Sequence, residues 1–291
     1  MLSLLAAASA AADPIYWSDL GLRPYLFKIG WFELRFYSLA YLIGVIFAYW
    51  HVSKMIKAPG APMAQRHADD LFFYCTLGVI LGGRLGYAIF YQPDLWDNPL
   101  DVLKVWEGGM SFHGGLIGVL IAIAFVTRSG NLSFLRVCDY IAVNVPMGMF
   151  LGRLANFNNG ELWGRPSDVP WAMVFPDPRA GEVARHPSQL YQAGLEGLVL
   201  LIILLLLFWK TRARYRPGLL VGIFTIGIGL ARFTNEFFRE PDAQLADFAM
   251  RTGLSMGQWL TIPLILTGLI VTIYAISRKP VGTGATKAAT D

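Results

Sequence analysis

The sequence predicts an all-α, polytopic membrane protein with seven transmembrane helices. Hydrophobic residues make up 55% of the 291 residues and charged residues 15%, a composition too apolar for an ordinary soluble domain. Seven apolar segments are each close to the roughly 20 residues that a spanning helix needs. We expect continuous helices, because backbone groups in lipid must form their hydrogen bonds within their own segment.

The predicted helices end where charged or polar loops begin. In order they are 36–52, 71–91, 112–127, 135–152, 190–209, 219–238 and 259–277. Basic residues follow the odd-numbered helices: Lys54, Lys57 and Arg66 after the first, Arg128 and Arg136 after the third, Lys210, Arg212, Arg214 and Arg216 after the fifth, and Arg278, Lys279 and Lys287 after the last. The loop between the second and third helices is acidic, with Asp94, Asp97, Asp101 and Glu107 against Lys104.

This distribution of charge predicts the orientation of the chain. By the positive-inside rule, the amino terminus is periplasmic and the carboxyl terminus cytoplasmic. The basic runs are explained as topology signals and lipid headgroup contacts, so they require no nucleic acid. We expect residues 1–35 to form an amino-terminal head and periplasmic segment, 36–277 one transmembrane domain, and 278–291 a cytoplasmic tail.

Several smaller features have structural explanations. The first dozen residues resemble the apolar part of a signal peptide but lack its basic start, so we expect a retained head, with a cleaved signal as the alternative. Cys75 and Cys138 imply neither a disulfide framework nor a metal cage, and packing is expected for both. Two small-residue ridges predict close helix packing. The first consists of Gly78, Gly82 and Gly86, and the second of Gly148 and Gly152.

The unusual polar residues gather at the predicted outward ends of the helices. Arg84 lies in the outward half of the second helix, and Tyr37 begins the first. His113 opens the third helix, and Arg153 and Asn156 close the fourth. Further polar residues at this level are Asn159, Glu161 and His186 in the outward loop and Arg232, Glu236 and Arg239, whose i, i+4, i+7 spacing predicts one face of the sixth helix. Desolvating such groups costs free energy, so we expect them to bind a polar or anionic ligand.

Each of these residues also has a structural alternative. Arg84 could extend its head group to the interface or pair with Glu236, and Arg232 with Glu236 could be an intrahelical ion pair. His113 could be a loop histidine satisfied by backbone groups. Against this last alternative, the neighbouring glycines predict a tightly folded backbone that approaches another group. These glycines are Gly108, Gly109, Gly114, Gly115 and Gly118.

The predicted set of side chains suits chemistry at a lipid headgroup. The forked guanidinium groups of Arg153 and Arg239 match phosphate oxygens and would stabilise the charge that grows on a leaving phosphate. His113 can accept a proton near neutral pH, as a thiol nucleophile requires. Asn156, Asn159 and Glu161 can orient ligand hydroxyls or the arginines. The sequence has no metal-ligand spacing, serine nucleophile elbow or phosphate-binding P-loop. We therefore predict a transfer reaction without metal or cofactor.

Four motifs together resemble those of bacterial prolipoprotein diacylglyceryl transferase. They are G-R-L-A-N-F-N-N-G-E-L-W-G, W-E-G-G-M-S-F-H-G-G-L-I-G, R-H-P-S-Q-L-Y and E-F-F-R-E-P-D, and the resemblance covers residues 36–277. It implies transfer of the diacylglyceryl group of phosphatidylglycerol to the lipobox cysteine of a prolipoprotein, as the first step of lipoprotein maturation. A thioether forms and glycerol 1-phosphate leaves. The resemblance also implies the bacterial inner membrane, with an active site that faces the periplasm.

The resemblance assigns roles by motif. His113 matches the essential histidine, Arg239 the arginine of E-F-F-R, and Tyr37 an aromatic-Tyr pair, while Arg153, Asn156 and Glu161 belong to the family signature. Arg35 stands where members often have histidine and Gln192 where a glutamate is common, so we assign neither to catalysis. The base stays open between His113 and a residue it supports. An arginine-lined pocket could instead lower the thiol pKa enough to form the thiolate.

Two other functions are weighed against this one. A transporter or channel would need polar residues in both leaflets, whereas the inner half of the predicted bundle is almost bare of them. A lipid-binding assembly protein would bind the same anion without converting it, and only the resemblance argues against that function.

Overall fold

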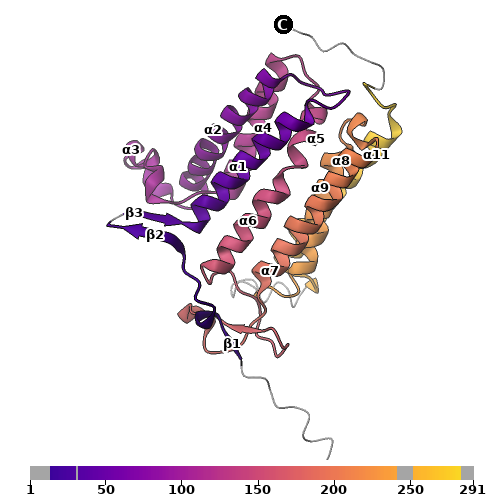
Figure 1. Cartoon of the computed structure of the whole chain (residues 1–291). Coiled ribbons are helices and arrows are strands. Elements are labelled where there is room, and N and C mark those ends of the chain that lie inside the picture. Colours follow the sequence, from indigo (N-terminus) through magenta and orange to yellow (C-terminus); the bar gives the residue numbers. More distant parts are fainter. Residues whose placement is uncertain (1–13, 31, 241–251, 283–291) are drawn as a thin grey trace, which may run out of the picture. The chain divides into compact units, whose positions relative to one another are not determined.

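The computed structural model describes residues 14–30, 32–240 and 252–282, and it is mainly helical (Figure 1). The predictions for the extreme amino terminus, for the end of the E-F-F-R-E-P-D motif and for Lys287 lie outside these residues. Within these described residues, six helical segments are long and apolar enough to cross a membrane: Phe36–Met55, Gln65–Phe90, Phe112–Ser129, Phe134–Asn158, Ser188–Lys210 and Met256–Ser277. A seventh apolar helix, Leu219–Asn235, has 17 residues and is shorter than the others. A polytopic membrane protein is therefore confirmed.

The elements follow one another along the chain as Figure 1 labels them. The strands are β1 (Ile15–Tyr16), β2 (Tyr25–Ile29), β3 (Phe32–Arg35) and β4 (Met173–Val174). The α-helices are α1 (Phe36–Met55), α2 (Gln65–Phe90), α3 (Pro99–Val102), α4 (Phe112–Ser129), α5 (Phe134–Ala142), α6 (Val145–Asn158), α7 (Ser188–Gln192), α8 (Leu200–Lys210), α9 (Leu219–Asn235) and α11 (Met256–Ser277). A π-helix, Ala193–Val199, joins α7 to α8, and short 3-10 helices span Trp17–Leu20, Pro93–Trp96, Val105–Glu107, Pro178–Ala180 and Ala213–Tyr215.

The chain divides into two compact units, each of which combines segments that are distant in sequence. Unit 1 contains the described residues of Met1–Gly44, Pro146–Ile203 and Phe224–Leu269. Unit 2 contains those of Val45–Val145, Leu204–Ile223 and Ile270–Asp291.

In unit 2, glycines let α2 and α4 pack against each other in close contact. A Cβ atom on Gly78 or Gly82 would meet the backbone of Gly118 or Gly114 at distances that real side chains do not adopt. The first predicted ridge is therefore confirmed as helix packing. The second ridge, which belongs to unit 1, is only half correct. Gly44 packs against Gly148, but a Cβ on Gly152 would have no heavy atom of the described chain within 4 Å.

Unit 2 also buries two polar groups whose partners are complete. The His51 ring lies between Asn144 Oδ1, 2.7 Å from Nδ1, and Trp209 Nε1, which donates to Nε2 at 3.1 Å. Asp139 is 1% exposed and accepts from the backbone N–H groups of Gly218 and Val221 at 2.8 and 2.9 Å. This carboxylate satisfies orphan donors at the start of α9, so it acts as a cap from another helix.

The predicted fourth helix is interrupted, which corrects the prediction of a continuous segment. Helical structure stops after Ala142 and resumes at Val145. Pro146 has no N–H group and cannot donate to the carbonyl of Ala142, four residues earlier. Asn144 instead donates from its side chain to the carbonyl of Tyr140 at 2.7 Å.

The sixth helix also ends earlier than predicted, at Asn235 instead of residue 238. The chain leaves the helix to pair with the loop that follows α6. Arg165 N donates to Phe238 O at 2.9 Å, and Gly164 forms an antiparallel bridge with Arg239. Arg239 is therefore not on a helical face with Arg232, although Glu236 still bonds one turn back to the Arg232 carbonyl at 3.0 Å.

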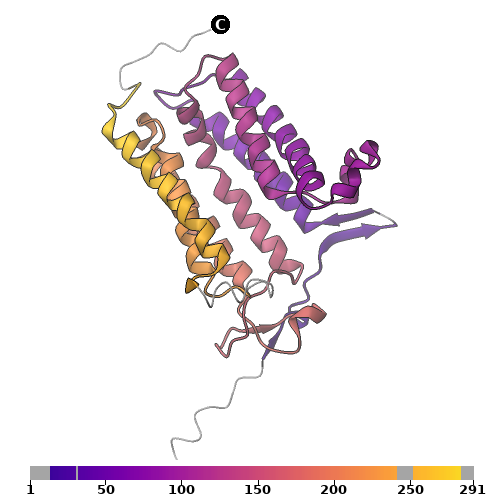
Figure 2. The ribbon, with the colours of Figure 1, turned by 180° about the vertical axis from the view of Figure 1, so that it is seen from behind.

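Unit 1 carries the small sheets and the long loop between α6 and α7. β2 and β3 form an antiparallel hairpin, and β1 pairs in parallel with β4 of the long loop. Trp17, Phe175 and Ala180 are the buried centre of this region, and Trp17 Nε1 donates to Phe157 O at 2.8 Å. Figure 2 shows the gold helix α11 from behind, and a Cβ on Gly229 of α9 would meet Ile265 of α11.

Candidate functional site

The last two turns of α6 place Arg153 and Asn156 in unit 1 as one hydrogen-bonded pair. Arg153 Nη1 donates to Asn156 Oδ1 at 3.4 Å, and Asn156 Nδ2 donates to Glu161 Oε1 at 2.8 Å. The amide thus has its oxygen toward the guanidinium and its nitrogen toward the carboxylate. Asn159 Nδ2 donates to the same Glu161 oxygen at 3.1 Å. The structure brings together these four predicted residues, and the contacts fix the direction of the Arg153 side chain.

The backbone after α6 is held tightly to keep Glu161 in this position. Glu161 O accepts from Gln189 Nε2 at 2.6 Å, and Leu162 O accepts from Ser188 Oγ at 3.0 Å. Leu162 has a positive φ of 58°, a conformation that costs free energy for a residue with a side chain. Such strain persists where surrounding contacts over-determine the backbone, and here α7 supplies those contacts.

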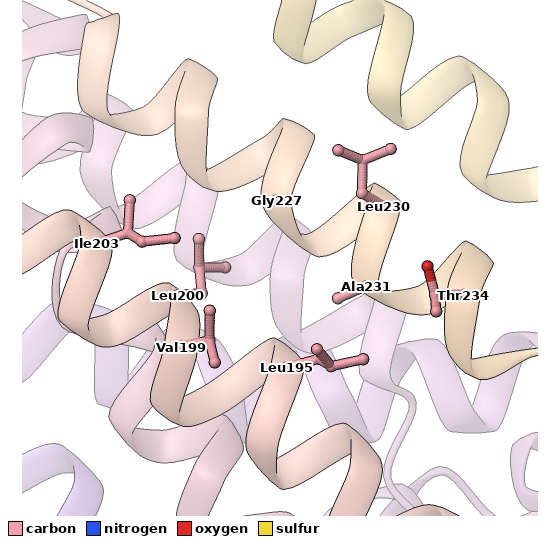
Figure 3. Close-up of a pocket in the computed structure, with 8 residues that line it drawn as sticks. All are labelled: Leu195, Val199, Leu200, Ile203, Gly227, Leu230, Ala231 and Thr234. Carbon is pink, nitrogen blue, oxygen red and sulfur yellow. The ribbon is translucent and has the colours of Figure 1, made fainter.

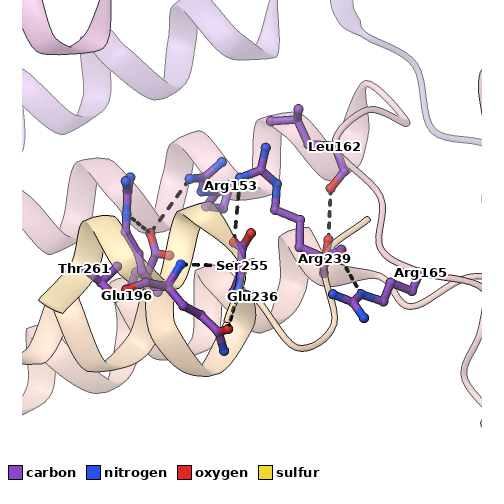
Figure 4. Close-up of polar contacts among 11 residues, drawn as sticks. Arg153, Leu162, Arg165, Glu196, Glu236, Arg239, Ser255 and Thr261 are labelled. Atoms are coloured by element: carbon purple, nitrogen blue, oxygen red, sulfur yellow. Dashed lines mark hydrogen bonds and ion pairs between the residues drawn. The ribbon is translucent and has the colours of Figure 1, made fainter. Parts of the chain in front are cut away.

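Glu196, which was not predicted from the sequence, lies between Arg153 and Arg232. This carboxylate is 1% exposed in the middle of the π-helix. Its Oε2 atom is 3.8 Å from Arg153 Nη2 and 3.8 Å from Arg232 Nε. Figure 4 shows Arg153 and Glu196 facing each other. The signal that could have identified it is a lone acidic residue inside the apolar segment 190–209.

Glu236 and Arg239 form a more exposed pair after α9. Arg239 Nη1 is 3.8 Å from Glu236 Oε2, and the Arg239 side chain is 45% exposed. The backbone of Arg239 is fixed from the other side, because Arg165 Nε donates to its carbonyl at 2.7 Å (Figure 4). The long loop between α6 and α7 therefore positions both the Glu161 cluster and the start of the Arg239 side chain.

An apolar cavity of about 230 Å³ is also found in unit 1 (Figure 3). Two of its lining residues are the neighbours of charged ones, because Leu195 precedes Glu196 and Ala231 precedes Arg232. Its lining is Leu195, Val199, Leu200, Ile203, Gly227, Leu230, Ala231 and Thr234. An apolar space of this kind suits an acyl chain.

His186 has a partner in the same unit. Trp171 Nε1 donates to the Tyr191 hydroxyl oxygen at 2.7 Å, so this hydroxyl can donate to His186 Nδ1, 3.0 Å away. The rings of His186, Tyr191 and Phe238 also pack edge to face. These contacts make His186 part of the folded loop.

Partial burial lowers the pKa of His186 from its ordinary value of 6.5, an effect that Asp168 opposes. The unfolded chain therefore takes up this proton at a higher pH than the folded chain, so the stability that neutral His186 contributes is lost as pH falls below about 6.5. We expect the melting temperature to decline between pH 7.5 and 5.5, and less steeply in His186→Gln. Thermal unfolding of purified protein in detergent measures this, and equal slopes in both proteins would contradict it.

Tyr37 lies at the start of α1 in unit 1, 40% exposed. Its hydroxyl is 3.4 Å from that of Tyr41, one turn later. The Tyr37 side chain is therefore partly exposed.

Arg84, in unit 2, proves to be a structural residue. It is 4% exposed and donates to the backbone carbonyls of Asp101 and Val102 at 2.8 Å each, and also to those of Gly108 and Gly109. The expectation that Arg84 extends to the interface or pairs with Glu236 is therefore replaced. The guanidinium fork binds the acidic loop between α2 and α4, because four carbonyls need several donors in fixed directions.

Arg84→Lys is expected to destabilise the protein, because an ammonium group cannot reproduce these contacts. A hydrogen bond to a charged group contributes about 1.5 to 3 kcal/mol, so we expect a melting temperature lower by roughly 3 to 10 °C. Arg128→Lys, on the exposed end of α4, is the matched control. If the Arg84 variant melts with the control and the parent, the loop does not depend on this fork.

His113, also in unit 2, is exposed in the first turn of α4. Ser111 Oγ caps this helix by accepting from Gly114 N at 3.2 Å. The His113 ring packs edge to face against Phe112, and among the described residues the imidazole nitrogens have no hydrogen bond. The alternative of a loop histidine satisfied by backbone groups is thus not observed, and the ring is accessible to a substrate.

Three arginines of unit 1 lie among three carboxylates. Arg153, Arg232 and Arg239 are accompanied by Glu161, Glu196 and Glu236, and the Arg153 side chain keeps 22% of its surface exposed. Across residues 14–30, 32–240 and 252–282, no three His, Cys, Asp or Glu side chains gather closely enough to hold a metal ion. The arrangement can bind a phosphate oxygen by charge-assisted hydrogen bonds.

Comparison with known proteins identifies the family. The prolipoprotein diacylglyceryl transferase family model matches residues 24–274. A phosphatidylglycerol–prolipoprotein diacylglyceryl transferase of Erythrobacter litoralis is 70% identical over 277 residues, which are 95% of this chain and 97% of that protein. Enzymes of the same name from Zymomonas mobilis and Rhodospirillum rubrum are each 50% identical, over 91% and 88% of this chain and 95% and 93% of their own lengths. The chain therefore belongs to the prolipoprotein diacylglyceryl transferase family.

Proposed function

We propose that this protein transfers the diacylglyceryl group of phosphatidylglycerol to the lipobox cysteine of prolipoproteins. The names of the relatives support the reaction and both substrates. The structural observation that carries the proposal is the Arg153–Asn156–Glu161 chain of contacts. It holds a partly exposed guanidinium in a fixed direction beside two further arginines.

The proposed reaction is a substitution at carbon. The cysteine thiol loses its proton to a base. The thiolate then attacks the carbon of the diacylglyceryl group that is bonded to a phosphate oxygen. A carbon–sulfur bond forms while that carbon–oxygen bond breaks, and the electron pair leaves with glycerol 1-phosphate. Charge grows on the departing phosphate, so groups that bind it more tightly in the transition state accelerate the reaction.

Arg153 and Arg239 are proposed to bind the lipid phosphate, with Asn156 and Glu161 as substrate-binding and orienting groups. Their observed contacts support these roles, because the Arg153 direction depends on Asn156 and the Arg239 backbone on the long loop. Tyr37 is proposed to contact the substrate from α1. Supporting positions are assigned to Asn159, His186, Arg232 and Glu236, and the apolar cavity beside Glu196 is proposed to accept part of an acyl chain.

His113 is proposed as the base that accepts the thiol proton, directly or through a residue that it supports. Its exposure and its position among the glycines at the start of α4 support this assignment. An imidazole is suited to the role because its ordinary pKa lies near neutral pH.

We place the enzyme in the bacterial inner membrane as one seven-helix catalytic domain of residues 36–277, with a periplasmic amino terminus and active site. The short-loop bias of Lys and Arg supports this orientation. Residues 278–291 would then form a cytoplasmic tail.

The orientation predicts which loops react with a reagent added outside the cell. In a background with Cys75 and Cys138 replaced by alanine, Asp168→Cys is expected to react with a membrane-impermeant thiol reagent. Arg212→Cys is expected to react only after the membrane is permeabilised. The reverse pattern in intact cells would overturn the orientation.

The transfer itself is tested with purified protein, phosphatidylglycerol and a lipobox peptide. We expect a peptide whose mass has increased by one diacylglyceryl group, and no such increase for a peptide with serine in place of cysteine. A protein that binds the lipid but yields no adduct would belong to the lipid-binding class instead.

A further inference from the structure

Among the described residues of unit 1, Glu196 is the most deeply buried acidic group. It lies at the centre of a seven-residue π-helix, a form of backbone that is rare and concentrated at functional sites. The next residue, Gly197, packs so closely on Phe150 of α6 that a Cβ there would lie 2.6 Å from Phe150 Cα. Phe150 is one turn before Arg153, so this contact brings the π-helix to the arginine.

The Oε2 atom of the Glu196 carboxylate contacts its two partners through long ion pairs. Arg153 Nη2 and Arg232 Nε both lie 3.8 Å from Oε2, which accepts no hydrogen bond within the described part of the chain. A buried charge is tolerated when opposite charges compensate it, and here two cations share one anion. Glu196 therefore offsets one positive charge of the two arginines.

Both arginine side chains are partly exposed. The Arg153 side chain is 22% exposed and that of Arg232 is 37% exposed, against 1% for Glu196. A ligand can thus reach the cations more easily than the anion between them. A lipid phosphodiester carries a single negative charge, whereas the phosphate monoester that leaves carries more near neutral pH, so binding of the monoester depends more strongly on the charge of the site.

We propose that Glu196 is a positioning residue that acts as the shared counter-ion of Arg153 and Arg232. It sets the distance between the two guanidinium groups and offsets one of their positive charges. The proposal rests on the proposed function. Without this carboxylate the site would carry one more positive charge, bind the released phosphate more tightly and turn over more slowly.

The experiment measures the dissociation constant of glycerol 1-phosphate by isothermal titration, together with kcat for transfer. For Glu196→Gln we expect a dissociation constant roughly tenfold lower and a kcat roughly tenfold lower. Arg232→Gln should weaken binding of the anion. The double variant Arg232→Gln with Glu196→Gln restores the parental charge of the site, so its dissociation constant should return to within about threefold of the parental value.

Asp139→Asn is the matched control, because Asp139 is equally buried but caps a helix in unit 2. It should lower the melting temperature and leave the dissociation constant unchanged. Should Glu196→Gln fail to fold, the comparison of the double variant with Arg232→Gln carries the test. An unchanged dissociation constant on removal of Glu196 would overturn the proposal. A different outcome would overturn the proposed function instead. In that case the dissociation constants would follow the charge of the variants as expected, but the parental protein would form no peptide adduct.

Discussion

Arg153→Lys is expected to lower the efficiency of transfer from phosphatidylglycerol by roughly tenfold to a hundredfold. Lysine keeps the charge but loses the planar fork that contacts Asn156 Oδ1 and faces Glu196. A charge-assisted contact contributes about 1.5 to 3 kcal/mol, and every 1.4 kcal/mol is a factor of about ten. Initial rates over a range of phosphatidylglycerol concentrations give kcat and KM for each variant.

The division of this loss between kcat and KM identifies the role of the arginine. An equal fall in kcat and kcat/KM means that Arg153 stabilises the transition state, and a rise in KM alone means that it binds the lipid in the ground state. Arg239→Lys is expected to show a loss in the same direction. Arg179→Lys is the control, since Arg179 is 83% exposed and pairs with Asp177. Parental kinetics in both Arg153→Lys and Arg239→Lys would mean that these arginines are structural.

His113→Asn is expected to leave a folded protein with transfer reduced about a hundredfold or more. Asparagine retains some hydrogen bonding but cannot take up a proton near neutral pH, and a positioned general base contributes about 10² to 10⁴ in rate. Because the imidazole is exposed and free of hydrogen bonds among the described residues, its loss should change the melting temperature little.

The control for this variant is His67→Asn. His67 is 9% exposed and accepts from Ala64 N at 3.2 Å, so its replacement is expected to lower stability and leave turnover unchanged. Full activity in His113→Asn would return His113 to a structural role. The thiol would then be deprotonated without this base, for example because nearby arginines lower its pKa.

The helices of this protein could be predicted because lipid imposes long apolar segments and confines charge to the loops. The same reasoning predicted the cluster around Arg153, because polar residues at a membrane interface must find partners. It placed the end of the sixth helix incorrectly, because the bridge between Gly164 and Arg239 joins residues 75 positions apart. A periodic pattern carries no information on such a distant pairing.

Other differences have local causes, and only some of these were visible in the sequence. Pro146 removes a donor and explains the interruption before α6, although an apolar count over 135–152 does not register it. The π-helix and Glu196 were not predicted, because leucines and valines dominate the apolar count over residues 190–209. The contacts of Arg84 were not predicted, because its partners are backbone carbonyls of the following loop and no side-chain pattern indicates them.

The most direct test of this mechanism follows the oxygen atom that joins the diacylglyceryl group to phosphorus. Phosphatidylglycerol labelled with ¹⁸O at this position is incubated with purified protein and a lipobox peptide, and both products are weighed by mass spectrometry. If a thiolate attacks carbon while Arg153 and its neighbours hold the departing phosphate, all of the label leaves in glycerol 1-phosphate and none remains in the thioether peptide. Label retained on the peptide, or a peptide that carries phosphorus, would contradict the account.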